Sequence, residues 1–306
     1  MRTITFKGLF LTALFVLFGS LAIQAADDRL ITQQTTIKLD KAGTLPSRIS
    51  ESKKYLITNL KIVGEVNGTD LKFIREMAGW YYDNNKTNGK LSILDLSEAK
   101  IVKGGDAYCW GFDHSHLYTS NDKLGDCVFY NCSGLTNITI PSSVTSIGEE
   151  SFWGCSGLTS VTIPSSVTSI GKGAFAACSG LTSVTIPSSV TEIGWYAFYN
   201  CSGLTSIYVY PEKKPDLKIG VFKGCDAKNC ILYVPTGTYD DYKSSDFGYF
   251  ENIVEFDAAG IDKVTTSTDA KEISRYSVNG QRLSAPVKGL NIVKYSDGSV
   301  KKVAVQ

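Results

Sequence analysis

Hydrophobic and polar positions recur along this chain with a period of 23 residues. Four cysteines at this spacing each begin nearly the same segment, CSGLTSVTIPSSVTSIG, which is followed by a short run containing a phenylalanine. A fixed period of this length predicts stacked repeats, with one repeat per rung. The aligned apolar columns are Leu135/Leu158/Leu181/Leu204, Ile138/Val161/Val184/Ile207, Ile140/Ile163/Ile186/Val209, Val144/Val167/Val190, Ile147/Ile170/Ile193 and Phe129/Phe152/Phe175/Phe198, and the cysteines are Cys132, Cys155, Cys178 and Cys201.

One repeat cannot fold alone, because about six buried apolar side chains do not offset the conformational entropy lost by 23 residues. Stacked neighbours cover the open faces and add strands to a growing parallel sheet. The predicted fold is therefore an α/β repeat, an elongated solenoid with a parallel sheet and a cap at each end.

Side chains within each repeat strand are expected to alternate between the core and the surface. Val161 and Ile163 point inward, and Ser160 and Thr162 point outward, because consecutive residues of a strand face opposite sides. Stacking then forms two outward columns that are uncharged and rich in hydroxyl groups. They form either a platform for a protein or a glycan, or simply a solvated sheet face. The candidate ligand-binding residues here are Thr139, Thr162, Thr185 and Tyr208.

A second set of aromatic residues varies between otherwise similar repeats, at positions where other copies carry small or charged residues. Large exposed rings are typical anchors of binding surfaces. The alternative is that these rings pack over the turns of the solenoid. The candidates in this set are Trp153, Trp195, Tyr196 and Tyr199.

Residues 26–90 are predicted to form an N-terminal cap. It contains a strand near 60–63 and a helix that Thr69 or Asp70 can cap. The solenoid with its C-terminal cap spans 91–257, beginning with a strand over 91–96 that is buried on both faces. The C-terminal cap contains a strand at 231–234, a short helix starting near Thr238 and a closing strand at 253–256.

The segment 109–131 is 23 residues long but irregular. Cys109, Leu117, Leu124 and Phe129 fall on repeat columns, while Ser115 occupies a column that is apolar elsewhere. It is either a degenerate rung or a loop whose register is coincidental.

The ends of the chain differ from the repeats. Residues 1–25 combine Arg2 and Lys7 with a short apolar stretch and small residues, as in a cleaved signal peptide. We therefore expect no membrane span in the mature chain. Residues 258–272 are predicted to be a linker, and 273–306 a small antiparallel β unit, because Asn279-Gly280 and Asp297-Gly298 are hairpin signals.

The charge balance and the cysteines restrict the function further. Without residues 1–25 the chain has 29 basic and 30 acidic residues, so phosphate-driven nucleic-acid binding is not expected. Stacked cysteines point in the same direction, so we expect the repeat cysteines and Cys225 to be buried free thiols. Cys127 and Cys230 lie outside this column, as does Cys109 if 109–131 is a loop, and these three are the better candidates for disulfides.

No catalytic motif is present. The chain lacks the sequence patterns of serine hydrolases, zinc proteases, phosphate loops and dinucleotide-binding folds. His114 and His116 could join Asp113 or Asp106 as metal ligands, but a solvated polar loop is favoured. We expect a protein without enzymatic activity, cofactor or bound metal.

The repeat CSGLTSVTIPSSVTSIG followed by AF, with LSILDLSEAKIV before the array and LYVPTGTYDDY after it, resembles the BspA-like leucine-rich repeat proteins of bacterial surfaces. The resemblance implies a non-catalytic protein, secreted or on the cell surface of a bacterium, that adheres to proteins or glycans of a host or of other bacteria. Ser143, Ser166 and Ser189 stand where the general leucine-rich pattern has asparagine.

The C-terminal unit, with RYSVNGQRL, KGLNIV and VKKVAV, is similar to the sorting domains of type IX secretion. The alternative is a permanent small sheet that closes or anchors the solenoid. A different class of function also remains open, a structural envelope protein whose array self-associates.

Overall fold

The computed structural model describes residues 29–81, 83, 85–111, 115–211, 213–257, 272–277, 282–286, 289–295 and 300–305. The predicted signal peptide, all but the last residue of the predicted linker, Asp113 and His114 lie outside the described residues.

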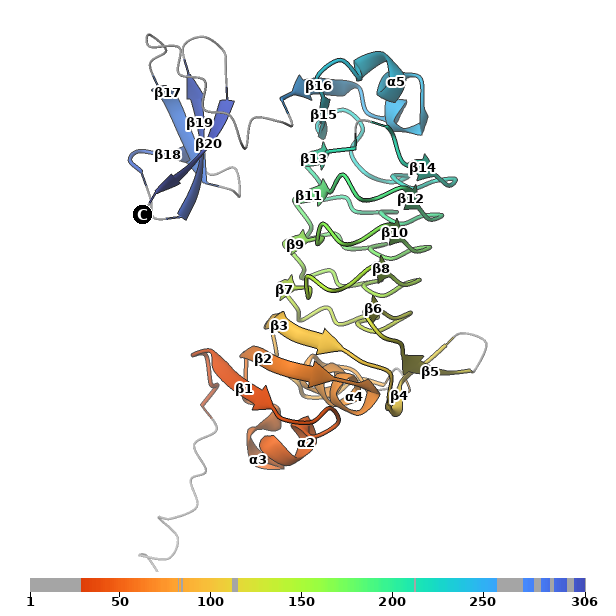
Figure 1. The fold of residues 1–306 in the computed structure, drawn as a ribbon, viewed down its shortest axis with the longest axis vertical. Helices are drawn as coiled ribbons and strands as arrows, with labels where there is room; N and C mark the ends of the chain where they lie inside the picture. The colour runs from red at the N-terminus through yellow and green to blue at the C-terminus, as the bar shows by residue number, and fades with distance from the viewer. Residues whose placement is uncertain are drawn as a thin grey trace, which may run out of the picture.

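Residues 29–257 form an elongated solenoid built on two parallel sheets (Figure 1). Within these two sheets, every strand pairs in parallel with the equivalent strand of the neighbouring rung. The larger sheet contains, in spatial order, β1 (Thr35–Leu39), β2 (Asn59–Val66), β3 (Ile93–Ile101), β7 (Asn137–Thr139), β9 (Ser160–Thr162), β11 (Ser183–Ile186), β13 (Ser206–Val209), β15 (Ile231–Pro235) and β16 (Asn252–Phe256). The smaller sheet contains β6 (Lys123–Leu124), β8 (Ser146–Ile147), β10 (Ser169–Ile170), β12 (Glu192–Ile193) and β14 (Asp216–Leu217).

The six apolar columns form one continuous core, as the sequence predicts. Their members are all at most 6% exposed. The phenylalanine column is a stack of nearly parallel rings, in which Phe175 lies 5.1 Å from Phe152 and 5.2 Å from Phe198 between ring centroids. Phe129 and Phe222 extend the stack at its two ends.

Polar side chains join each rung to the rung before it. The Cys178 thiol donates to the Phe152 carbonyl (3.2 Å), and the Thr182 hydroxyl donates to the Thr159 carbonyl (3.2 Å). Ser189, at the position of the expected asparagine, donates to the Val167 carbonyl. These bonds replace an asparagine ladder. All eight cysteines are buried and free, which confirms the expectation for the repeat thiols but not the suggested disulfides of Cys109, Cys127 and Cys230.

The N-terminal cap contains α2 (Leu45–Arg48), α3 (Glu51–Lys54) and α4 (Gly68–Met77). The predicted helix is present, but Asn67 caps it instead of Thr69 or Asp70. Asp70 occupies the third helical position, where its carboxylate accepts the Asn67 N–H and completes a capping box. The same carboxylate accepts the N–H groups of Gly43 and Leu45, so it joins the helix to the preceding turn.

Strand β3 alternates between faces, which corrects the prediction that 91–96 is buried on both. Leu94 and Leu96 are fully buried, whereas Ile93 is 37% exposed. The outer face of this strand is a solvated sheet surface because no element of the described chain covers it.

The segment 109–131 is half hairpin and half rung. Strands β4 (Gly104–Trp110) and β5 (His116–Thr119) form an antiparallel hairpin, and β3 pairs directly with β7. The prediction of a whole degenerate rung is therefore wrong for its first half. The second half occupies rung positions, because Leu124 pairs with Ile147 and Phe129 stacks on Phe152.

The C-terminal cap follows the predicted order of strand, helix and strand. After β15, Thr238 precedes α5 (Tyr239–Lys243), a 3-10 helix η1 (Asp246–Tyr249) follows, and β16 closes the sheet. A separate antiparallel sheet contains β17 (Glu272–Ser277), β18 (Arg282–Leu283), β19 (Gly289–Tyr295) and β20 (Val300–Val305), in the order β18-β17-β19-β20.

Candidate binding surface

The outer face of the larger sheet displays the predicted columns in register. Thr139, Thr162, Thr185, Tyr208 and Tyr233 occupy paired positions on five consecutive strands. Thr162 and Thr185 are exposed, and the other three side chains are half-buried. The neighbouring column is Asn137, Ser160, Ser183 and Ser206. We call these two rows the hydroxyl columns.

An aromatic cluster stands at the C-terminal end of the hydroxyl columns. The rings of Tyr208 and Tyr233 stack 4.4 Å apart, at 4° to each other. Phe256 contacts Tyr208 edge to face at 6.1 Å and Tyr210 at 5.1 Å. Burial and the adjacent Tyr233 hydroxyl raise the pKa of Tyr208 to about 12, so it stays neutral at physiological pH. We call these four residues the aromatic cluster.

Sequence reasoning found only Tyr208 of this cluster. Tyr233 follows Tyr208 by 25 residues, because insertions lengthen the last rungs beyond the 23-residue period. The alternation in Ile231–Pro235 was the available signal, since Leu232 and Val234 are buried and place Tyr233 on the outer face.

The other predicted aromatic residues lie at the turns that follow the smaller sheet, away from the hydroxyl columns. Trp195 is 47% exposed, whereas Trp153, Tyr196 and Tyr199 are half-buried. The Trp153 ring packs over Gly173 of the next rung, where an added Cβ would lie 2.9 Å from the ring. Tyr196 packs over Gly220 in the same way and contacts Tyr199 edge to face at 5.7 Å. The eight candidate residues therefore occupy two separate surfaces.

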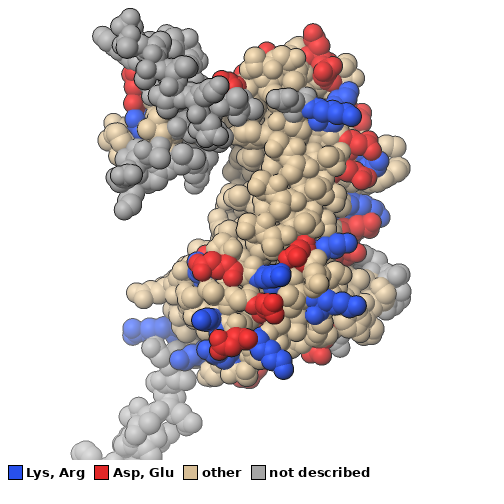
Figure 2. Space-filling view, in the orientation of Figure 1, with Lys and Arg blue, Asp and Glu red and all other residues tan. Residues whose placement is uncertain are grey.

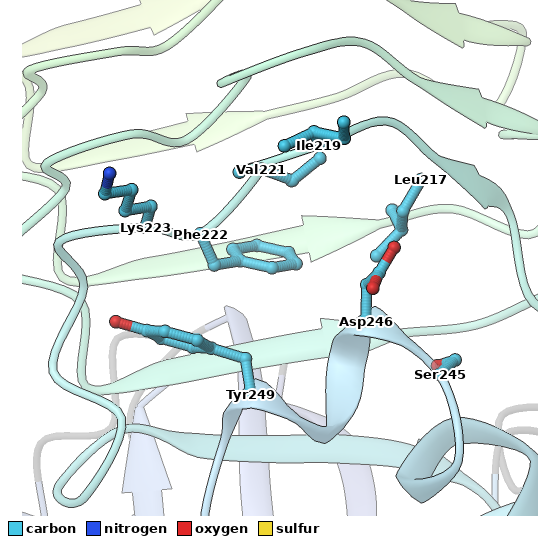
Figure 3. A pocket seen from close by; sticks show the side chains of 9 residues that line it. Leu217, Ile219, Val221, Phe222, Lys223, Ser245, Asp246 and Tyr249 are labelled. Atoms are coloured by element: carbon cyan, nitrogen blue, oxygen red, sulfur yellow. The ribbon is translucent and has the colours of Figure 1, made fainter.

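A pocket of about 350 Å³ lies near Trp195, between the last rung and η1. Figure 3 shows Phe222 and Tyr249 lining it, with Lys223 and Asp246 at its sides. Ile219, the neighbour of Trp195 in the next rung, is 65% exposed at this pocket. This surface combines apolar and charged groups, unlike the hydroxyl columns.

Charged side chains are unevenly distributed over the surface. Figure 2 shows them over the N-terminal cap and along the edge of the smaller sheet, with an uncharged band between. Where the outer face of the larger sheet meets the cap, Lys61 pairs with Asp95 (3.4 Å) and Glu98 (2.6 Å). Lys61 therefore offsets one of the two negative charges next to the Thr139 end.

The described residues hold no group of side chains arranged for a metal ion. No cluster of three His, Cys, Asp or Glu with metal-binding geometry occurs among them, and His116 on β5 packs against Trp110 on β4. Burial raises the pKa of Cys132 to about 11 and that of Cys178 to about 12, so these thiols remain protonated. The hydrogen bond with Cys127 lowers the pKa of the buried Cys109 thiol; burial opposes this shift and the charge of Arg75 adds to it.

The fold and its surfaces define a solenoid repeat protein with a rigid, uncharged outer sheet face. Residues 107–232 match the BspA type leucine rich repeat region in six copies. This part of the chain is therefore a BspA-type leucine-rich repeat region. Among the described residues no helix is long enough to cross a bilayer, since even α4 has only 10 residues.

Several solved structures are similar to parts of this chain. The leucine rich repeat protein of T. pallidum is 26% identical over 49% of this chain and 66% of its own, with a TM-score of 0.36. A leucine-rich repeat protein from Bacteroides ovatus is 21% identical over 72% of this chain and 42% of its own, with a TM-score of 0.40. A leucine rich cell surface protein from Faecalibacterium prausnitzii is 24% identical over 60% and 48%, with a TM-score of 0.31. This chain thus spans less than two thirds of the length of each, and no curated protein matches it.

Proposed function

We propose that this protein is a secreted or surface-displayed binding protein that attaches to a protein or glycan of a host or of other bacteria, without catalysis. The observation that carries the proposal is the outer face of the larger sheet, an uncharged row of hydroxyl groups that ends in an aromatic cluster. A solenoid presents such a row as a rigid, extended surface. The cell surface protein of Faecalibacterium prausnitzii, which shares part of the sequence, is consistent with display outside the cell.

The proposed organisation has five parts. Residues 1–25 direct export, 26–90 cap the solenoid, 91–257 form the solenoid with its C-terminal cap, 258–272 link, and 273–306 form a β unit for sorting or anchoring. The antiparallel pairing of β17, β19 and β20 supports a separate C-terminal unit. A type IX sorting role for it predicts that this unit is absent from the exported protein. Intact mass of the protein recovered from the cell surface and from the medium tests both ends.

Binding is tested with the full chain after removal of 1–25, screened against immobilised extracellular matrix proteins and polysaccharides. The proposal expects saturable binding to at least one of them. Two variants locate the surface, Thr162→Val/Thr185→Val on the hydroxyl columns and Trp195→Ser at the turns. Loss of binding in one variant but not in the other assigns the surface, and absence of binding to every immobilised ligand contradicts the proposal.

A structural scaffold is the second candidate, and the open edges of the larger sheet favour it. Strands β1 and β16 end the nine-stranded sheet, so each has one row of backbone groups without a strand partner in it. A second copy could extend the sheet from either edge. Sedimentation across a concentration series separates the candidates, because a scaffold associates with itself and a binding protein remains monomeric until its ligand is added.

A further inference from the structure

The threonines near the outer face of the larger sheet differ in what their hydroxyls do. Thr159 and Thr182 donate to the backbone carbonyl of the preceding rung, at 3.0 Å and 3.2 Å. Thr162 and Thr185 lie three residues further along, are exposed, and form no side-chain hydrogen bond within the part of the chain that the structure describes. The first pair stabilises the stack, while the second pair leaves both donor and acceptor capacity open to a ligand.

The ring of Tyr208 lies at one end of this row of unbonded threonine hydroxyls. Its ring stacks on Tyr233, which stands at the paired position of the next strand. On its other side the paired residue is Thr185, whose side chain is too short to cover a ring. The face of the Tyr208 ring that is not stacked on Tyr233 is therefore directed toward the side of Thr185 and Thr162. The ring is held in this orientation by Tyr233 and by the edge of Phe256.

The chemistry of this row matches a sugar better than a protein surface. Each pyranose unit carries hydroxyls around its rim and C–H groups on its faces, so it can use open threonine hydroxyls and an aromatic face together. The cores of protein interfaces are enriched in aromatic residues, Met and Arg and depleted of serine, so the aromatic cluster suits either ligand, whereas the long row of hydroxyl groups suits a sugar. A glycan lying along the solenoid axis would meet the same pair of columns at every strand, about every 4.8 Å.

The absence of charge along the row selects among glycans. No Lys, Arg, Asp or Glu occupies the hydroxyl columns from β7 to β13, or the paired outer positions of β15. The nearest carboxylate along the column, Asp95, is paired with Lys61. A sulfated or carboxylated glycan would find no cation along this row, so a neutral one is favoured.

We propose that the hydroxyl columns and the aromatic cluster form a binding site for a neutral glycan, with Tyr208 stacking against one sugar ring and Thr162 and Thr185 hydrogen-bonding the next ones. This inference rests on the proposed binding function and names the ligand class for one of its two surfaces. Tyr208, Tyr210, Tyr233 and Phe256 set the end of the site, so a chain end or a branch point is accommodated there.

The test is affinity gel electrophoresis of the full chain after removal of 1–25, in gels containing dextran, mannan, a soluble β-glucan or xylan, with heparin as the anionic comparison. We expect at least one neutral polysaccharide to retard the protein and heparin not to. The variants Tyr208→Ser and Thr162→Val/Thr185→Val should each raise the dissociation constant about tenfold. Valine keeps the β-branched shape that suits a strand, so it removes the hydroxyl alone.

Two control variants separate binding from folding. Thr182→Val breaks the hydrogen bond to the Thr159 carbonyl, so it should lower the melting temperature and leave retardation unchanged. Thr191→Val breaks the hydrogen bond to the Thr168 carbonyl beside the smaller sheet and should also leave retardation unchanged. Retardation by heparin alone, or retardation that survives Tyr208→Ser in a folded protein, overturns the glycan site.

The two proposals fail in distinguishable ways. If no polysaccharide retards the protein but a matrix protein still binds in the screen above, the glycan site is wrong and the binding function stands. If neither class of ligand binds, the binding function is wrong and the glycan site falls with it.

Discussion

The phenylalanine stack offers the sharpest quantitative prediction about stability. Phe175 is fully buried in the middle of the solenoid, between two nearly parallel rings at 5.1 and 5.2 Å. Replacing it with alanine removes a whole ring from a closed core, which typically costs about 3–5 kcal/mol. Because total stabilities of about 5–15 kcal/mol are usual, Phe175→Ala should remove a large share of the stability.

A second substitution separates ring pairing from burial. Phe175→Leu keeps most of the apolar volume but loses both ring contacts, each worth roughly 0.5–1.5 kcal/mol. We therefore expect a loss of about 1–3 kcal/mol, which is smaller than for alanine. Thr162→Ala on the exposed sheet face serves as the reference and should lie within about 0.5 kcal/mol of the parent protein.

Urea unfolding followed by circular dichroism and tryptophan fluorescence measures these differences. A repeat array is held together by contacts between neighbouring rungs, so weakening a central rung also lowers cooperativity. The Phe175→Ala transition should therefore move to lower urea and become broader. A loss below about 1 kcal/mol for Phe175→Ala, or equal losses for alanine and leucine, would refute the reasoning that the stacked rings stabilise the core.

Three further predictions concern the backbone, the cap and the thiols. Ala177 has a φ of 56° and its neighbour Ala176 does not, so Ala177→Gly should raise the unfolding free energy by up to about 1 kcal/mol and Ala176→Gly should lower it, as urea midpoints would reveal. Asp70→Ala leaves three backbone N–H groups without their acceptor and should cost about 2–4 kcal/mol, while Asp70→Asn, which keeps one side-chain oxygen, should cost less. Burial raises the pKa of the Cys178 thiol from 9.0 to about 12, so this thiol loses its proton at lower pH in the unfolded chain than in the folded one. The free energy of unfolding should therefore fall between about pH 9 and 12. In Cys178→Ala, the slope of that free energy against pH should be smaller by about 1.4 kcal/mol per pH unit. An unchanged slope in that variant would count against a buried protonated thiol.

The periodic part of this fold was predictable because each repeated residue becomes a row in space. The period alone placed Leu158, Val161 and Phe152 in the core, and alternation placed Thr162 outside. Residue propensity and periodicity are sufficient to predict which side chains are buried where every rung has the same neighbours above and below it. The same rule failed at Leu117, because the chain leaves the array there to form a hairpin whose pairing depends on tertiary contacts.

The candidate surface was predictable only in part. The threonine positions followed from alternation, but the difference between Thr182 and Thr185 depends on which hydroxyl reaches a carbonyl of the preceding rung. Tyr233 lies outside the regular period, so its stacking on Tyr208 required the actual strand register. Tyr196 was expected as a possible contact residue, yet it covers Gly220 in the following rung, a pairing of large and small residues that no single repeat reveals.

The side-chain ladders give the solenoid a direction. Thiol and hydroxyl donors of each rung bind carbonyls of the rung before it, as Cys201 does with Phe175 and Ser166 with Val144. In the first rung Thr136 donates to the Ser92 carbonyl of the preceding strand, whereas the buried hydroxyl of Ser143 forms no hydrogen bond within the described chain. Losing the N-terminal cap would therefore expose a core face and leave donors unpaired, whereas losing the C-terminal cap would leave carbonyls, which tolerate incomplete pairing better. The larger and more elaborate cap accordingly stands at the end where the stack begins, and there the buried Asp70 joins the capped helix α4 to the turn before it.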